Sequence, residues 1–280
     1  MGYVLKDVLK EFIPEGLLSH LSNHFEVIGD LAIISIPPQL DNYKTRIAET
    51  IITQRKNIST VLNKITKVSG QKRTPLYEIL AGTTTVTCHR EFGFVYRLDI
   101  NTTFFSTHLA YERKRIFDQV RVGECVLVPF CGVGPFAIPP AAKGAKVVAI
   151  EQNPEAFGWL SKNVSLNRVD KLITIINGDA FDTSILPHHE FVRAIIPTPY
   201  GMDTILDVIK PVMIEDGIIH FYTFKKRYQI PELIKEYESK GFEVKFYRSC
   251  GNVAPNVSRW VFDLIKRGKP ENSQNREISD

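Results

Sequence analysis

The chain has 280 residues, of which 44% are hydrophobic and 24% are charged, as in a globular protein with one large core or two smaller ones. No apolar run reaches the roughly 18 residues that a membrane-spanning helix needs, and the first residues lack the continuous apolar segment of a signal peptide. The net charge of +4 allows a nucleic-acid partner without requiring one. We therefore expect a cytoplasmic protein with no membrane segment.

Residues 1–104 have the pattern of a small α+β domain. Helical spacing of apolar residues covers 5–12, 15–25 and 43–55, strand-like runs cover 31–36 and 60–68, and a hairpin is expected over 83–100 with its turn near 91–93. Nothing in this part resembles a nucleotide-binding loop.

Residues 105–267 have the pattern of a second, larger domain. After a charged helix over 109–120, strands are expected at 125–130, 147–151, 173–178, 193–197 and 217–224, with helices at 136–144, 153–167, 203–213 and 230–241. This alternation predicts an α/β fold with a doubly wound parallel sheet. The last two strands, 242–251 and 258–266, have no helix between them and should form an antiparallel hairpin at a sheet edge. The polar tail 268–280 is expected to be disordered.

A glycine turn follows the first strand of this second domain. Gly132, Gly134 and Ala137 fit the dinucleotide-binding spacing G-x-G-x-x-A, but the same strand, turn and helix also suit S-adenosyl-L-methionine. The turn alone leaves the cofactor open.

Two acidic residues at successive strand ends separate these cofactors. Glu151 is placed to accept the ribose hydroxyls, and Asp179 to accept from an adenine amino group. Taken singly, Asp179 is as well explained as a turn or helix cap, whereas for Glu151 a surface acid is the weaker alternative. Together they suit an adenosyl group without phosphates better than a dinucleotide, whose pyrophosphate favours a helix N-terminus. We therefore expect S-adenosyl-L-methionine as the cofactor.

The loop after the fourth strand reads Pro197, Thr198, Pro199, Tyr200. Many transferases that act on ring or amide nitrogens carry Asn-Pro-Pro-Tyr or Asn-Leu-Pro here, with the Asn holding the reacting amine. In this chain the prolines stiffen the loop and Tyr200 can stack on a substrate, but the Asn is absent.

Eight ordered segments resemble one known family. They are "RTPLYEILAG", "HREFGFVYRLDI", "FFSTHLAYERKRI", "CGVGPFAIP", "AIEQNPEAF", "NGDAF", "IIHFYTF" and "NVAPNVSRWVFDL". The chain resembles, as a divergent archaeal-type member, the tRNA methyltransferases that modify guanosine N1 at position 37, together with the aminocarboxypropyltransferases of wybutosine synthesis. The resemblance implies a Rossmann-like class I S-adenosylmethionine-dependent transferase domain and tRNA as partner; we further expect a monomer without a metal.

The resemblance also assigns residues. It implies that Ser106, Arg113, Glu151 and Asp179 contact the cofactor, and we expect Gly132 and Gly134 of the turn, with Gln152 and Ala180, to complete the cofactor site. It further implies that Glu112 is the general base for guanine N1 and that Arg73 steadies the charge developing on the base oxygen, roles that suit a carboxylate and a guanidinium. The residues alone, without the resemblance, favour a structural ion pair or solvated helix charges.

Two departures from the family pattern bear on function. Pro129 stands where the family usually has an acid at the end of the first strand, and Pro197 replaces the usual Asn. "GVGPFAIP" and "HFYTF" look like the methyltransferase branch, whereas Glu151 in place of Asp and the lack of an extra N-terminal domain look like the aminocarboxypropyl branch. We expect a tRNA methyltransferase at guanosine N1. The alternatives are aminocarboxypropyl transfer to a wyosine-precursor base, a divergent methyltransferase for another RNA position or a protein, and a non-catalytic RNA-binding relative.

Overall fold

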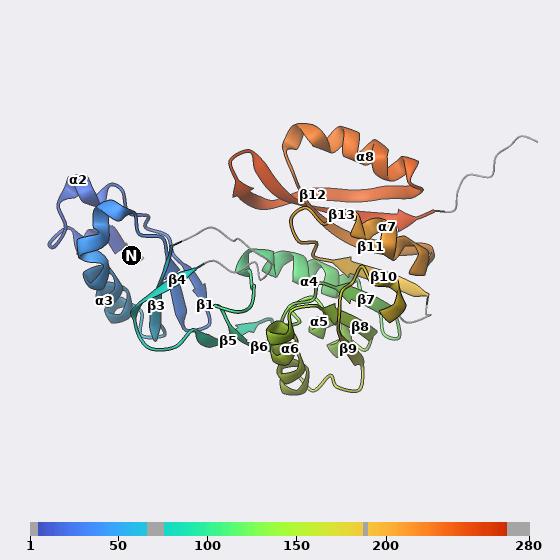
Figure 1. Cartoon of the computed structure of the whole chain (residues 1–280), viewed down its shortest axis with the longest axis horizontal. Helices are drawn as coiled ribbons and strands as arrows, with labels where there is room; N and C mark the ends of the chain where they lie inside the picture. Colours follow the sequence, from blue (N-terminus) through green and yellow to red (C-terminus); the bar gives the residue numbers. More distant parts are fainter. Residues whose placement is uncertain (1–4, 66–75, 187–189, 268–280) are drawn as a thin grey trace, which may run out of the picture.

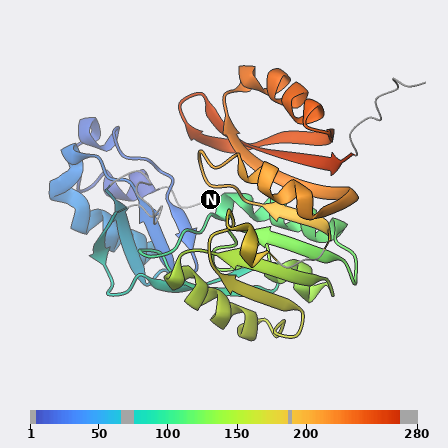
Figure 2. The same ribbon diagram turned by 45° about the vertical axis from the view of Figure 1, so that its right-hand side comes forward.

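The computed structural model describes residues 5–65, 76–186 and 190–267. A smaller N-terminal lobe and a larger lobe stand apart, with a two-stranded hairpin between them (Figure 1, Figure 2). The predicted disordered tail 268–280 lies outside the described residues, and so does the end of the strand expected over 60–68.

The N-terminal lobe is a four-stranded sheet covered by helices. Its strands lie in the order β1-β2-β3-β4, with β2 and β3 parallel and the other neighbours antiparallel. The elements are α1 (Leu5–Leu9), α2 (Glu15–Leu18), β1 (Glu26–Ile28), β2 (Leu31–Ile34), α3 (Lys44–Gln54), β3 (Thr60–Lys64) and β4 (Tyr77–Ala81). The helix predicted over 43–55 is confirmed as α3. The predictions over 5–12 and 15–25 were too long, since α1 ends at Leu9 and α2 at Leu18. Pro14 disfavours a helical conformation at the residue before it and so separates the two helices.

The hairpin is formed by β5 (Val86–Glu91) and β6 (Phe94–Asp99), as the sequence predicted. Its two-residue turn has positive φ at both positions, 49° at Phe92 and 87° at Gly93, which is the turn that suits the twist of a hairpin. One side of the hairpin contacts the N-terminal lobe, since Thr87 Oγ1 donates to Asp30 Oδ1. On the other side, Asn163 and Asn167 of the larger lobe each bond its backbone.

The larger lobe is built on a seven-stranded sheet in the order β12-β13-β11-β10-β7-β8-β9. Strands β9, β8, β7, β10 and β11 are parallel, and β13 and β12 add an antiparallel hairpin at the edge, as expected. The strands are β7 (Cys125–Pro129), β8 (Lys146–Glu151), β9 (Ile173–Asn177), β10 (Phe191–Ile196), β11 (Met213–Lys225), β12 (Phe242–Ala254) and β13 (Val257–Lys266).

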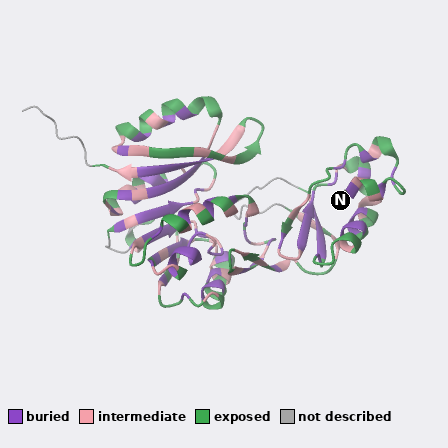
Figure 3. Cartoon of the chain, turned by 180° about the vertical axis from the view of Figure 1, so that it is seen from behind, coloured by how far each residue is buried: buried purple, intermediate pink, exposed green. Residues whose placement is uncertain are grey.

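Helices cover both faces of this sheet. Val126 and Val128 of β7 lie in one buried cluster with side chains of three helices, α4 (Ala110–Gln119), α5 (Ile138–Ala142) and α6 (Pro154–Leu166). Leu127, which points to the opposite face, lies in a second cluster with α7 (Ile205–Ile209) and α8 (Ile230–Ser239). The doubly wound fold is therefore confirmed. Figure 3 shows the inner strands buried and the edge strand β12 largely exposed.

Hydrophobic contacts do not stop at the expected boundary between residues 104 and 105. One buried cluster runs from Leu31 of β2 through Tyr96 and Leu98 of the hairpin to Val126 of β7. The division into domains 1–104 and 105–267 stays a prediction. Within the described ranges, no helix has both the length and the apolarity needed to cross a membrane.

Candidate functional site

The glycine turn lies between β7 and α5, at the carboxyl end of the sheet. Gly132 and Gly134 have φ values of 57° and 98°, a backbone region that side chains disfavour. A Cβ on Gly134 would also lie 2.8 Å from the side-chain ends of Ile138 and Leu160, so a substitution there is strained by its φ and crowded as well. A Cβ on Gly132 would meet only the Phe104 carbonyl oxygen at 3.8 Å. The turn is therefore open beside the segment that leads to Ser106.

Glu151 ends β8 beside this turn. Its Oε2 accepts from the Gly132 N–H at 2.7 Å, and its Oε1 accepts from the Asn153 N–H at 2.8 Å. Burial raises the pKa of the Glu151 carboxyl, while the backbone N–H groups that bond it oppose this rise. Each oxygen keeps a further acceptor site, so the side chain is fixed in position and can still bind hydroxyl groups.

The next strand end carries Asp179 and Ala180. Asp179 is exposed and its Oδ1 accepts from the Phe181 N–H at 3.0 Å, so the turn-cap interpretation of this residue holds in the structure. The second oxygen of Asp179 has no such bond among the described residues. Gln152 is exposed, and its carbonyl oxygen and that of Glu151 accept from the Asn177 side chain. These residues lie at adjacent strand ends, as the sequence predicted.

Arg113 and Ser106 are joined to each other and to the hairpin. The guanidinium of Arg113 bonds both oxygens of Glu91 at 2.6 Å and donates to the Ser106 carbonyl. Although burial acts to raise it, Arg113 and His89 hold the pKa of Glu91 below its usual range. The donors of Arg113 are thus used within the protein, and its clearest task is to fix the hairpin to α4.

Glu112 is the most buried carboxylate of the candidate site, with 1% of its surface exposed. Its Oε2 accepts from Arg115 Nε at 2.9 Å and from the Tyr222 hydroxyl at 3.2 Å. Its Oε1 lies 2.9 Å from Arg248 Nε, as an ion pair that lacks hydrogen-bond geometry. One oxygen of a fully buried carboxylate is therefore left without a hydrogen bond, which is costly unless a ligand uses it.

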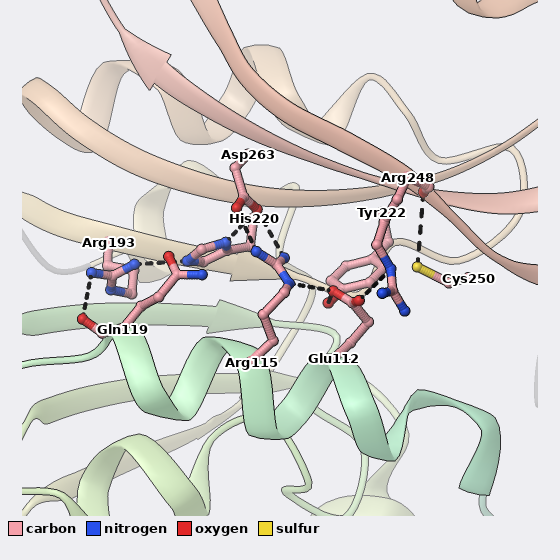
Figure 4. Close-up of polar contacts among 9 residues, drawn as sticks. All are labelled: Glu112, Arg115, Gln119, Arg193, His220, Tyr222, Arg248, Cys250 and Asp263. Carbon is pink, nitrogen blue, oxygen red and sulfur yellow. Dashed lines mark hydrogen bonds and ion pairs between the residues drawn. The ribbon is translucent and has the colours of Figure 1, made fainter.

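A chain of polar side chains continues from Glu112 across the sheet (Figure 4). Arg115 forms two bonds with Asp263, and Asp263 Oδ1 lies 2.7 Å from His220 Nδ1. His220 Nε2 lies 2.7 Å from Arg193 Nη1 and must accept, because arginine only donates; its Nδ1 therefore carries the proton that bonds Asp263. Burial lowers the pKa of His220, consistent with a neutral ring.

Asp263 joins the two parts of this series of polar side chains, because it bonds both Arg115 and His220. Burial opposes its charge, but bonds from His220 and Arg115 outweigh burial and lower the pKa of Asp263 to about 2. At the far end, Arg193 pairs with Glu124 at 2.8 Å. The chain thus positions Arg115, and through Arg115 the Glu112 carboxylate.

The loop after β10 is anchored at one residue and exposed at another. Thr198 is buried and bonds the Ile196 carbonyl, whereas the Tyr200 side chain is 67% exposed and its ring lies 5.6 Å from that of Phe224. Pro197 and Pro199 flank Thr198 and are partly buried. The loop therefore presents an aromatic ring at the carboxyl end of β10.

Sequence reasoning missed several residues of this region. His220, Arg193 and Asp263 each interrupt an apolar strand, and a charged or polar residue inside such a run is the signal that would have found them. Arg73, expected beside Glu112, lies outside the described residues. Within the described residues, no group of three His, Cys, Asp or Glu side chains is arranged to hold a metal ion.

Comparison with known protein families explains this arrangement. Residues 87–246 match the family described as the TRM5/TYW2 methyltransferase domain, and residues 5–85 match the TYW2 N-terminal domain. The chain belongs to the TRM5/TYW2 family. The two matches confirm the resemblance, one over the N-terminal part of the chain and one over the remainder up to residue 246.

Two curated relatives of this TRM5/TYW2 chain carry different activities in their names. The tRNA (guanine(37)-N(1))-methyltransferase Trm5b of Pyrococcus abyssi is 35% identical over 76% of the chain, which spans 63% of that protein. The tRNA(Phe) (4-demethylwyosine(37)-C(7)) aminocarboxypropyltransferase of Pyrococcus horikoshii is 36% identical over 93% of the chain and 95% of that protein.

Solved structures agree with the fold of this TRM5/TYW2 chain. A complex of aTrm5 with tRNALeu has a TM-score of 0.83 and 28% identity, covering 95% of this chain and 78% of that one. Pyrococcus horikoshii TYW2 in complex with MeSAdo has a TM-score of 0.74 and 29% identity, covering 93% and 97%.

Proposed function

We propose that this chain is an S-adenosyl-L-methionine-dependent transferase that methylates N1 of guanosine 37 in tRNA. The observation that carries the proposal is the Glu112 carboxylate. It is fully buried, has one oxygen without a hydrogen bond, and lies on the helix whose neighbouring residue, Arg113, joins the Ser106 segment beside the glycine turn. A buried carboxylate with a spare acceptor site is suited to take a proton from a substrate nitrogen.

The residues of the chain would divide the reaction as follows. Oε1 of Glu112, which is ion-paired with Arg248 but carries no hydrogen bond, would accept the proton of guanine N1, and the N1 electron pair would form the new bond to carbon. The cofactor supplies a methyl group on a sulfonium, whose carbon–sulfur bond breaks to leave S-adenosylhomocysteine. Arg115 and the Tyr222 hydroxyl hold the other Glu112 oxygen in place. We propose that Arg73 offsets the charge on the base oxygen.

The donor and acceptor set at the glycine turn fits the adenosyl half of the cofactor. Glu151 keeps free acceptor sites while backbone N–H groups fix it, and one oxygen of Asp179 is open at the next strand end. We propose Gly132, Gly134, Gln152 and Ala180 as neighbours of the same group. Pro129 offers no carboxylate for the amino-acid end, so that end must be held elsewhere.

Substituting Glu151 tests this assignment. Glu151→Ala removes the acceptor of two ribose hydroxyls, and we expect S-adenosylmethionine affinity to fall about 10- to 150-fold. Isothermal titration measures it, with Glu155→Ala on α6 as control. Affinity should also fall on acidification through the raised pKa of Glu151, since the protonated acid loses acceptor capacity. If Glu151→Ala binds S-adenosylmethionine as tightly as the unaltered protein, both at neutral pH and after acidification, Glu151 does not belong to the cofactor site.

Aminocarboxypropyl transfer is the second candidate, and the N-terminal match favours it. Residues 5–85 match the TYW2 N-terminal domain, and the chain spans 95% of the Pyrococcus horikoshii enzyme but 63% of Trm5b. Incubating the chain with S-adenosylmethionine and either unmodified tRNA or tRNA carrying the wyosine precursor separates the two. Mass spectrometry of the product nucleosides distinguishes an added methyl group from the much heavier aminocarboxypropyl group. If radiolabelled S-adenosylmethionine labels protein and no RNA, both candidates are wrong.

We propose tRNA as the partner of a cytoplasmic monomer, bound through phosphate contacts on the N-terminal lobe and hairpin. Arg90, Arg97 and His89 line an open cleft of about 570 Å³ between β1–β2 and the hairpin.

Affinity for tRNA should fall steeply as the salt concentration rises, with a slope of about −0.7 to −0.9 per neutralised phosphate on logarithmic axes. Replacing Arg90 and Arg97 with Gln should make the slope shallower by about 1.5, whereas Lys235→Gln on α8 should leave it unchanged. Filter binding at several salt concentrations measures this, and a flat response in the unaltered protein would oppose an RNA substrate.

A further inference from the structure

Arg259 of β13 is the arginine in this region that has no acidic partner among the described residues. The other buried or half-buried arginines around the site are paired, Arg113 with Glu91, Arg115 with Asp263 and Glu112, Arg193 with Glu124, and Arg248 with Glu112. Arg259 is half-buried, and its guanidinium carbon lies 5.0 Å from the centre of the Phe224 ring. No hydrogen bond or ion pair joins its side chain to the rest of the described chain.

Apart from the Phe224 ring, the groups around Arg259 do not offset its charge. It interacts electrostatically with Tyr222, Cys250 and Arg113. Burial raises the pKa of the Tyr222 phenol well above its usual range and that of the Cys250 thiol to about 11, so both are neutral at physiological pH, and Arg113 is itself positive. An unpaired cation removed from water is costly, and such a group is found where a ligand supplies the missing partner.

The position of Arg259 assigns that ligand to the substrate side of the site. Glu151 ends β8, and four strand spacings separate β8 from β13 in the sheet, roughly 19 Å. This distance exceeds the reach of an arginine side chain, so Arg259 does not contact the ribose acid itself. Phe224, by contrast, is paired with Arg259 in register and contacts Tyr200 of the loop after β10. Arg259 therefore lies beside the exposed aromatic ring, away from the ribose acid.

The chemistry of this corner suits a purine base. Stacked aromatic side chains hold bases, and a guanidinium donates two parallel hydrogen bonds to guanine O6 and N7. We propose that Arg259 is a specificity-determining residue that binds the O6 and N7 edge of the target guanine while Tyr200 and Phe224 contact its ring. The inference rests on the proposed transfer to a guanine base. Guanine O6 has two acceptor sites, so a contact from Arg73 is compatible with it.

Two substitutions test this role against a structural one. Arg259→Met removes a cation that no carboxylate stabilises, so its melting temperature should equal or exceed that of the unaltered protein. The matched control, Arg193→Met, strands Glu124 and should melt at a lower temperature. In steady-state transfer to tRNA, Arg259→Met should lose about 10²-fold in kcat/KM, while S-adenosylmethionine affinity stays the same. Arg259→Lys should recover only part of the loss, because lysine lacks the planar pair of donors.

A modified substrate identifies the contact itself. Replacing the target guanosine with 7-deazaguanosine removes N7, and the unaltered protein should lose about tenfold in kcat/KM, whereas Arg259→Met should lose nothing further. Three results would overturn the role of Arg259. The first is an equal loss of kcat/KM on 7-deazaguanosine in both proteins, and the second is a wild-type kcat/KM in Arg259→Met. The third is a melting temperature of Arg259→Met as low as that of Arg193→Met. Those results leave the proposed function standing if the unaltered protein modifies tRNA. No transfer to tRNA by the unaltered protein would overturn the proposed function and the base contact together.

Discussion

Glu112→Gln should lower the rate of transfer about 10²- to 10⁴-fold, because the amide keeps the shape of the side chain but cannot accept the N1 proton. Affinity for S-adenosylmethionine should change little, since the groups assigned to the ribose and adenine lie at β8 and β9. Raising the pH should restore part of the rate, because guanine N1 then loses its proton to solvent. Single-turnover transfer to tRNA across a pH series measures both effects.

The control for Glu112→Gln is Asp118→Asn, on the exposed side of the same helix, which should leave the rate unchanged. Loss of the Glu112 charge also leaves Arg115 and Arg248 with one acidic partner fewer, so melting temperatures must accompany the kinetics. A normal rate in Glu112→Gln would make the guanine-N1 mechanism wrong for this chain and favour a different substrate.

Asp263→Asn should lower the free energy of unfolding by about 3–5 kcal/mol, because it leaves Arg115 buried with a weaker partner and changes the bond to His220. The pKa of Asp263 is about 2 in the folded protein, below its value in an unfolded chain, about 3.9. Such a depressed pKa contributes stability that is complete above the unfolded value and is lost as the pH falls through the folded one. We expect about 2–3 kcal/mol of stability to disappear between about pH 4 and pH 2.

Urea unfolding across that pH range measures both effects. Asp263→Asn should start less stable at neutral pH and should lack this part of the acid-induced loss. Glu215→Gln, an exposed partner of Lys266, serves as the control and should change stability by less than about 0.5 kcal/mol. If Asp263→Asn unfolds at the same urea concentration as the unaltered protein, the chain of bonds from Glu112 to Arg193 does not stabilise the fold.

The regular elements of the larger lobe were predictable because their signals are local. Apolar runs of strand length alternate with amphipathic helices, and the absence of a helix between residues 251 and 258 correctly predicted the antiparallel edge. The two glycines of the turn and Glu151 were predictable because a parallel sheet brings successive strand ends to one edge. Helix lengths near Pro14 were not, because turn geometry there overrides the apolar spacing.

The ion pairs of the site were beyond local reasoning. Arg115 and Asp263 are 148 residues apart and Arg113 and Glu91 are 22 apart, so only the tertiary fold makes them neighbours. Nothing in the local sequence tells Arg113, which pairs with Glu91, from Arg259, which has no acidic partner among the described residues. Only the contacts separate an arginine that fixes the fold from one left for a ligand.

The hairpin 86–99 has a consequence for where this chain can be cut. In the sequence it precedes residue 104. Its backbone nevertheless forms hydrogen bonds with the side chains of Asn163 and Asn167, and its Glu91 is paired with Arg113. A fragment ending at residue 104 would keep the hairpin and lose all three partners, exposing Tyr96 and Leu98, whereas one beginning at residue 86 would keep them together. A cut before residue 86 would still break the bond from Thr87 to Asp30, but it would leave the hairpin with the three partners in the larger lobe.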